Sequence, residues 1–248
     1  MVRQPTSPAS QTVLITGAAR RIGRAIALDM AAAGWSVAVH YRRSRSDAEL
    51  LVRDIEAAGG QARAFAADLA DFNAIGDLVA QCAADLGPPQ CLINNASEFL
   101  PDSVGSIDEA TWDTHLDINL KAPVFLAQAM VRHLPDGAHG NIINIVDQRV
   151  WKLTPDFFSY TISKAGLWTA TRTLAQGLAP RVRVNAIGPG PAMRSVHQSE
   201  ADFAAEQQST PLLTGPSLDE ITAAVRFILA APSMTGQMIV LDGGQHLA

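Results

Sequence analysis

The stretch TVLITGAARRIG, residues 12–23, decides the fold. Its apolar first part, residues 12–16, predicts a short buried strand. Gly17 then allows a tight turn, and a helix is expected from about residue 21 to residue 33, where Gly34 ends it. A strand that passes through a glycine turn into a helix forms the first half of a βαβ unit, in which the next strand lies parallel to the first.

The alternation of strand and helix continues to the C-terminus. Apolar runs predict further strands at residues 36–41, 62–67, 91–94, 141–146, 182–187 and 238–241. Helices are expected at about residues 47–58, 71–86, 107–133, 155–178 and 218–230, with Pro123 as a break or a helix start in the third of these. Seven strands separated by helices predict an α/β protein with a doubly wound parallel sheet and helices on both faces.

Domain organisation follows from the positions of these elements. Residues 1–11 carry two prolines and several small polar residues, and we expect a flexible N-terminal tail there. Residues 12–248 are then expected to form a single domain. Residues 188–216 are expected to form a loop with short helices, and their weak pattern suits a mobile substrate loop over a ligand.

Composition restricts the class of function. The 248 residues include 19 Lys and Arg against 24 Asp and Glu, a net charge of −5, so no overall basic field favours nucleic acid. We find no apolar stretch that could span a membrane and no signal-peptide core, so a cytoplasmic enzyme is expected. Neither the two cysteines nor the histidines have the spacing of metal ligands, so no metal site is expected.

The glycine turn has the features of a phosphate site. Gly17 and Gly23 allow close backbone approach, and the helix that follows offers free N–H groups and the positive end of its dipole. Arg21 takes a middle position that many such loops fill with glycine. Its guanidinium has five donors and can reach a diphosphate or a carbonyl-rich substrate, or it can simply face solvent.

The end of the second strand indicates which dinucleotide binds. NAD sites place a carboxylate there for the ribose 2′-hydroxyl. This chain reads HYRRSR at residues 40–45, with no acid before Asp47. Guanidiniums and a hydroxyl suit a 2′-phosphate, so NADPH is the predicted cofactor, although a basic run can also be only a solvated face.

A carboxylate and a Tyr–Lys pair stand beyond the middle of the chain. Asp147 closes the strand at residues 141–146, and Tyr160 and Lys164 follow with the i,i+4 spacing that puts them on one helix face. We expect the Lys164 ammonium to lower the pKa of Tyr160, and a nearby Asp147 to oppose this while burial raises the pKa of Asp147 itself. The two acids would then titrate together and share one proton.

From Thr12 to the C-terminus the chain resembles the short-chain dehydrogenases/reductases, which have a single Rossmann-type domain. The motifs that carry the resemblance are the glycine turn, Asn94-Asn95-Ala96, Asn119, Tyr160 with Lys164, Pro189-Gly190 and Asp242-Gly243-Gly244. The family is typically tetrameric, so the resemblance implies a homotetramer.

Within that family the chain is most similar to the pteridine reductase and dihydromonapterin reductase branch. Three departures from ordinary members indicate it: Arg21, the HYRRS run at residues 40–44, and Asp147, where most members have the catalytic serine. The run NASEF at residues 95–99 also resembles that branch. The segment Pro191-Ala192-Met193 differs, because pteridine reductases often place a serine there.

The resemblance implies NADPH-dependent reduction of a dihydropterin-type substrate. Tyr160 with Asp147 would protonate the pterin, Lys164 would also hold the nicotinamide ribose, and Asn119 would hold a water linked to Lys164. The substrate would contact Arg21, Ser97, Phe99, Asp147 and Tyr160. The cofactor would contact Gly17, Arg21, Ile22, Gly23, Tyr41, Arg42, Arg43, Ser44, Asp68, Leu69, Asn95, Ala96, Ser97, Tyr160, Lys164, Pro189 and Gly190.

Two other functions stay open at this point. One is a carbonyl or 3-oxoacyl reductase in which Asp147 simply replaces serine. The other is a non-catalytic, NADP-binding regulatory protein, which the intact Tyr160 and Lys164 disfavour.

Overall fold

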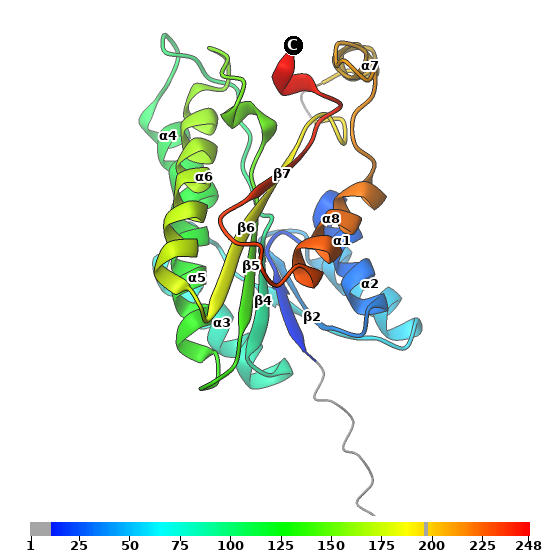
Figure 1. The fold of residues 1–248 in the computed structure, drawn as a ribbon, viewed down its shortest axis with the longest axis vertical. Helices are drawn as coiled ribbons and strands as arrows, with labels where there is room; N and C mark the ends of the chain where they lie inside the picture. Colours follow the sequence, from blue (N-terminus) through cyan, green and yellow to red (C-terminus); the bar gives the residue numbers. More distant parts are fainter. Residues whose placement is uncertain (1–10, 196–197) are drawn as a thin grey trace, which may run out of the picture.

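The protein is built on one parallel sheet of seven strands. The computed structural model describes residues 11–195 and 198–248, so the predicted tail lies, except for Gln11, outside the described residues. The sheet has the order β3-β2-β1-β4-β5-β6-β7 (Figure 1). Its strands are β1 (Thr12–Ile15), β2 (Ser36–Tyr41), β3 (Gln61–Ala66), β4 (Pro89–Asn94), β5 (Gly140–Ile145), β6 (Val182–Pro189) and β7 (Met238–Leu241).

Helices cover both faces of the sheet. They are α1 (Arg21–Ala32), α2 (Arg45–Ala57), α3 (Phe72–Leu86), α4 (Glu109–Leu116), α5 (Ala122–His133), α6 (Phe158–Leu178), α7 (Glu200–Gln208) and α8 (Leu218–Ala230). In Figure 1, α1, α2 and α8 lie on one side of the sheet, whereas α3, α4, α5 and α6 lie on the other. The predicted fold class, a doubly wound parallel sheet in a single domain, is confirmed.

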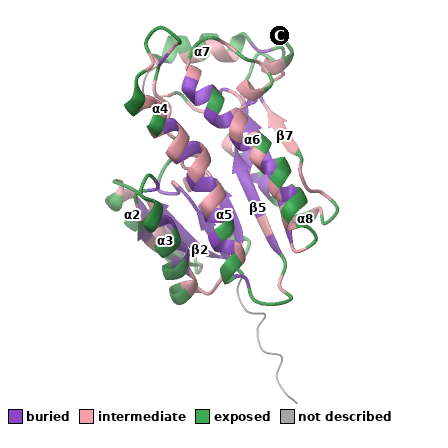
Figure 2. Ribbon diagram, turned by 90° about the vertical axis from the view of Figure 1, so that its left-hand side faces the viewer, coloured by how far each residue is buried: buried purple, intermediate pink, exposed green. Residues whose placement is uncertain are grey.

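The core forms because alternate side chains of the central strands point to opposite faces. In β1, Val13 and Ile15 enter the cluster beneath α1 and α8, and Leu14 enters the cluster beneath α3 and α5. All three are completely buried, as expected for a strand covered on both sides. Figure 2 shows the same distribution, with buried strands inside and exposed residues on the outer faces of the helices.

The predicted elements are present, with shifted ends. The helical region expected at residues 107–133 is divided by a π-helical turn, Asp117–Lys121, which ends just before Pro123 in the first turn of α5. The helix expected from residue 155 begins at Phe158, because Phe157 takes a left-handed conformation with φ 54°. β6 continues to Pro189, which pairs with Leu241 of β7. None of the helices in the described part of the chain is long and apolar enough to cross a membrane.

The tight contact between α1 and the turn after β1 gives a stability prediction. A Cβ on Gly23 would lie 2.4 Å from the Gly17 carbonyl oxygen, so Gly23→Ala should destabilise the fold by about 1–3 kcal/mol. Gly76 is the matched control, since a Cβ there meets nothing within 4 Å and Gly76→Ala should stabilise α3 by about 0.4–1 kcal/mol. Thermal or urea unfolding without coenzyme measures both, and equal effects of the two substitutions would contradict this account.

Candidate active site

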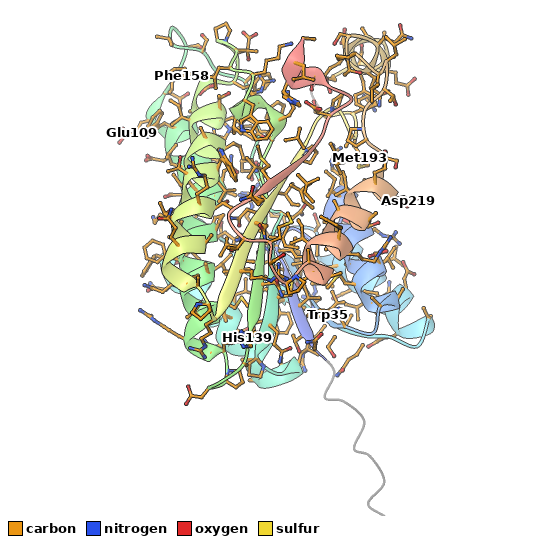
Figure 3. All side chains as sticks on the ribbon, viewed as in Figure 1. Trp35, Glu109, His139, Phe158, Met193 and Asp219 are labelled. Carbon is orange, nitrogen blue, oxygen red and sulfur yellow. The ribbon has the colours of Figure 1, made fainter. Side chains whose placement is uncertain are left out.

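The carboxyl ends of the strands surround a cavity of about 1080 Å³. Typical small-ligand pockets have roughly 300–1,000 Å³, so this one has room for a large ligand. Figure 3 labels Phe158 and Met193 at this end of the molecule, opposite Trp35 and His139. In an open parallel sheet, ligands bind at this edge, where the strand order reverses between β1 and β4.

The cavity collects most of the predicted site residues. Those that line it come from the turn after β1 and from the segments that follow β2, β3, β4, β5 and β6, together with α6. Three predicted residues do not line it within the described chain: Tyr41, Asp68 and Asn119. The structure therefore joins segments that are as far apart in sequence as Gly17 and Gly190.

Asp147 and Tyr160 are in direct contact in this cavity. The Tyr160 hydroxyl donates a hydrogen bond to Asp147 Oδ2 at 2.9 Å. The other carboxylate oxygen, Oδ1, accepts the backbone N–H of Arg149 at 2.8 Å, so the carboxyl group caps the short helical turn Gln148–Val150. Asp147 is thus held by its own turn while α6 brings the phenol to it.

Burial dominates the electrostatics of this pair. It raises the pKa of Asp147, against the lowering effects of the Arg149 and Tyr160 hydrogen bonds. Burial also raises the pKa of Tyr160 well above its ordinary value, and the negative charge of Asp147 adds to the shift. The phenol therefore stays protonated and is a proton donor that points at a carboxyl group.

The expectation that Lys164 lowers the pKa of Tyr160 is wrong for this structure. The Lys164 ammonium lies 5.7 Å from the centre of the Tyr160 ring and donates to the Ile145 carbonyl oxygen at 2.9 Å. Burial lowers the pKa of Lys164 to about 8, with Asp147 opposing the shift. For the pKa of Tyr160, desolvation of the phenol and the charge of Asp147 thus outweigh the lowering effect of Arg149.

The start of α6 is fixed by a loop that follows β4. The Asp102 carboxylate accepts the Ser159 N–H at 3.2 Å and also accepts the Ser159 hydroxyl. His115 binds the other side of this hydroxyl: its Nε2 accepts the Leu100 N–H at 3.0 Å, so its Nδ1 carries the proton that faces Ser159 Oγ at 2.6 Å. The network is buried and sits beside Tyr160. It sets the position of the phenol.

Asn119 lies in the π-helical turn and supports the loop after β4. Its Oδ1 accepts the Glu98 N–H at 2.9 Å, and its Nδ2 donates to the Glu98 carbonyl oxygen and to Ser163 Oγ, both at 3.0 Å. Ser97 Oγ donates to Asn119 Oδ1 at 3.1 Å. The predicted water between Asn119 and Lys164 stays a prediction, while the observed contacts assign Asn119 to the geometry of Ser97 and Glu98.

Phe99 belongs to an aromatic group that the sequence did not reveal. Its ring stacks on Phe157 with a centroid distance of 4.1 Å and an interplanar angle of 9°, and meets Tyr160 edge-on at 4.7 Å. The Arg149 guanidinium covers Phe157, 5.4 Å from its centroid. One face of Phe99 is therefore already occupied by Phe157. No sequence pattern around Phe157 predicted its left-handed backbone conformation.

The glycine turn fits the predicted dinucleotide. Gly17 has a φ of 61°, and a Cβ there would lie 3.0 Å from Ala96 Cα, so only glycine suits this position. Within the described chain α1 begins without a side-chain cap and without an acidic residue in its first turn, which leaves its amides for a phosphate. The donor set matches a diphosphate group.

His40 holds this turn in place, a role that the sequence did not indicate. Its Nδ1 accepts the Gly17 N–H at 3.0 Å and its Nε2 donates to the Ala67 carbonyl oxygen at 3.1 Å. Burial lowers the pKa of His40 to about 4, so the ring is neutral and keeps this pattern. His40, the first residue of the basic run, thus has a structural role: it holds the glycine turn.

Arg21 joins the turn to the loop after β6. It has a left-handed φ of 55°, the conformation that favours the glycine found at this position in many such turns. Its guanidinium donates to the carbonyl oxygens of Arg194 at 2.7 Å and Met193 at 3.1 Å. Its predicted contacts with coenzyme and substrate stay predictions. Residues 196–197 of the predicted mobile loop lie outside the described residues.

No group of three or more His, Cys, Asp or Glu side chains in the described ranges could hold a metal ion. Both cysteines are free and buried, and burial raises the pKa of each thiol to about 12, so neither is a nucleophile. The ionisable chemistry of the cavity therefore centres on Asp147, Tyr160 and Lys164.

A parallel sheet with a glycine turn after β1, and with a Tyr–Lys pair on α6 that faces Asp147 at the end of β5, defines an oxidoreductase. The short chain dehydrogenase family model matches residues 11–203, and the chain belongs to this family. The expected family is thereby confirmed.

Three individual proteins illustrate what this chain is similar to within and around the family. FolM alternative dihydrofolate reductase 1 from Brucella suis, solved in complex with NADP, is 50% identical and superposes with a TM-score of 0.94 over 97% of this chain and 96% of that one. A blue fluorescent protein from a metagenomic library, in complex with NADPH, is 30% identical with a TM-score of 0.88, over 95% of this chain and 97% of that one. The 3-oxoacyl-[acyl-carrier-protein] reductase FabG of Staphylococcus aureus strain N315 is 31% identical over 96% of this chain and 99% of its own length.

The raised pKa of Asp147 leads to a prediction for stability. The folded protein binds a proton at Asp147 more readily than the unfolded chain, so stability is lost as the pH rises from the ordinary value of 3.8 through the folded-state pKa. Asp147→Asn has no such loss. Its melting temperature relative to the natural protein should therefore increase with pH across this range.

Thermal unfolding at a series of pH values checks this expectation. Asp113→Asn, which removes an exposed carboxylate of α4, is the charge-matched control. A melting temperature of Asp147→Asn that falls relative to the natural protein as the pH rises would contradict the proposed burial effect.

Proposed function

We propose that this enzyme uses NADPH to reduce a dihydropterin-type substrate, such as a dihydropterin or dihydrofolate, to the tetrahydro form. The observation that carries the proposal is the 2.9 Å hydrogen bond from the Tyr160 hydroxyl to Asp147 Oδ2. A ring nitrogen must gain a proton as the adjacent carbon gains a hydride. A buried phenol beside a carboxyl group of raised pKa supplies two adjacent acids for this purpose.

The similar proteins support this substrate class. The Brucella suis protein, half of whose aligned residues are identical, is named an alternative dihydrofolate reductase and was solved with NADP. Asp147 stands where a serine would serve an ordinary carbonyl reductase, which is why we favour a nitrogen over a carbonyl oxygen as the atom to be protonated.

The cavity has residues for each part of the coenzyme. The first-turn amides of α1 would bind its diphosphate, and Lys164 would bind the nicotinamide ribose. Arg42, Arg43 and Ser44 would bind its 2′-phosphate. The bound coenzyme supplies the hydride. Lys164 is buried and already bonded to the Ile145 carbonyl oxygen, so its ammonium is held in a fixed place.

The side chains of the chain itself would orient and protonate the substrate. Phe99, which lines the cavity, would stack on the flat ring, and Arg21 and Ser97 would bond to its polar edge. Tyr160 Oη would give its proton, and the Asp147 carboxyl would stabilise and then restore the phenol by sharing its own proton. We infer in the same proposal that the enzyme works in the cytoplasm as a homotetramer.

A second candidate is a reductase of 3-oxoacyl or small ketone substrates. The curated FabG relatives favour it, since they match nearly the whole chain at 30–31% identity. In that case Asp147 would take the place of a serine that steadies the carbonyl oxygen.

A steady-state comparison tests the two candidates. Purified protein is given NADPH or NADH with dihydropterins, dihydrofolate and a panel of ketones including a 3-oxoacyl thioester, and loss of the reduced nicotinamide is followed by absorbance. We expect turnover of a dihydropterin or dihydrofolate with preference for NADPH. Good turnover of ketones with none of any pterin or folate would refute the proposal.

Asp147→Ser separates the candidates further. Loss of a positioned acid lowers kcat on a pterin by about 100-fold or more, because general acid–base groups contribute roughly 10²–10⁴. A carbonyl reductase would keep or gain activity on ketones with the serine restored. A melting curve of the variant confirms that the fold is retained.

A further inference from the structure

Two arginines of the basic run after β2 are already engaged in ion pairs, which the sequence does not indicate. Arg45 pairs with Glu49 of its own helix at 2.7 Å, and Arg42 pairs with Glu98 at 2.6 Å. Within the described residues Arg43 forms no ion pair. Of the three arginines in this run, two already have a carboxylate partner, and Arg42 is the one of these two that lines the cavity.

The Arg42–Glu98 ion pair crosses the crevice in which a dinucleotide would lie. Arg42 directly follows β2, and Glu98 lies in the loop beyond β4. β1 and its glycine turn lie between these two strands, and the strand order reverses there. Both side chains line the cavity that also holds Gly17.

Hydrogen bonds fix the backbone of Glu98, the acidic partner in this ion pair. The backbone of Glu98 is held on both sides by Asn119, which accepts its N–H at 2.9 Å, donates to its carbonyl oxygen at 3.0 Å, and is itself completely buried. The loop can therefore not move away from the crevice without loss of both bonds. Only the Glu98 side chain is free to swing.

The pair is open to exchange with another anion. The side chains of Arg42 and Glu98 are 34% and 27% exposed, so water screens their attraction. A phosphate monoester carries about 1.5 to 2 negative charges and bonds a guanidinium in bidentate fashion. It is thus a stronger partner for Arg42 than the carboxylate, which in turn repels it.

On the basis of the proposed use of NADPH, we propose that Glu98 determines coenzyme specificity: it holds Arg42 across the crevice until a 2′-phosphate displaces its carboxylate. NADH has no such phosphate and leaves the ion pair in place. Glu98 then reduces the preference for NADPH below what Arg42 and Arg43 alone would give. The position of Glu98, four residues beyond β4, is the reason that the motif at the end of β2 does not reveal this residue.

Coenzyme binding without substrate tests this role. NADPH and NADH are titrated separately into the natural protein and into Glu98→Gln, and their Kd values are measured by calorimetry. Glu98→Gln should bind NADPH about fivefold more tightly with little change for NADH, because removal of one screened, partly exposed charge changes affinity by a small factor. Since no turnover is measured, failure of the pterin proposal would not affect the result.

Two further variants test whether the effect of Glu98→Gln depends on its ion pair with Arg42. Glu49→Gln removes the carboxylate of a similar ion pair outside the cavity and should leave the ratio of the two Kd values unchanged. Arg42→Met should weaken NADPH binding about tenfold or more, as expected for loss of a charge-assisted bond, and should abolish most of the effect of Glu98→Gln when combined with it.

The proposal would be overturned by any of three results. The first is a Kd ratio that Glu98→Gln leaves unchanged or shifts toward NADH. The second is an equal shift in Glu49→Gln, which would indicate a general charge effect. The third is a full Glu98→Gln effect in the absence of Arg42, which would mean that the ion pair plays no part.

Discussion

The hydrogen bond between Tyr160 and Asp147 joins the end of β5 to α6, and the rest of the cavity is arranged around it. Burial raises the pKa of both groups, so the carboxyl group and the phenol hold their protons more firmly than they would in water. The low polarity of the strand ends thus sets the acidity of the pair.

Maintaining the pair requires support from distant segments. The loop after β4 contributes Asp102, which caps α6 at Ser159, and it is itself supported by Asn119 from the π-helical turn. The same loop carries Glu98 to Arg42 at the coenzyme end. One loop, held by the buried Asn119 and His115, therefore links the proton donor to the place where the coenzyme would bind.

Much of the fold could be predicted from the sequence because most strands are short, largely apolar runs between turn signals, as in β1 and β7. The Tyr160 and Lys164 spacing likewise placed both side chains in the cavity. Contacts that depend on backbone conformation could not be predicted, such as the left-handed Phe157 under Arg149 or the attachment of Arg21 to Met193. The direction of the Tyr160 pKa was also missed, since desolvation depends on how closely the strands and loops pack.

Titration of Tyr160 tests the central claim most directly. The chain has two tyrosines, so Tyr41→Phe leaves Tyr160 as the sole source of a tyrosinate signal. Ultraviolet difference spectra, or carbon NMR of a labelled tyrosine ring, would follow its ionisation as the pH rises. The account predicts no tyrosinate at or below pH 10, the ordinary pKa of the phenol, while the protein stays folded. A tyrosinate that forms clearly below that value would show that Lys164 controls the phenol, and would contradict the account.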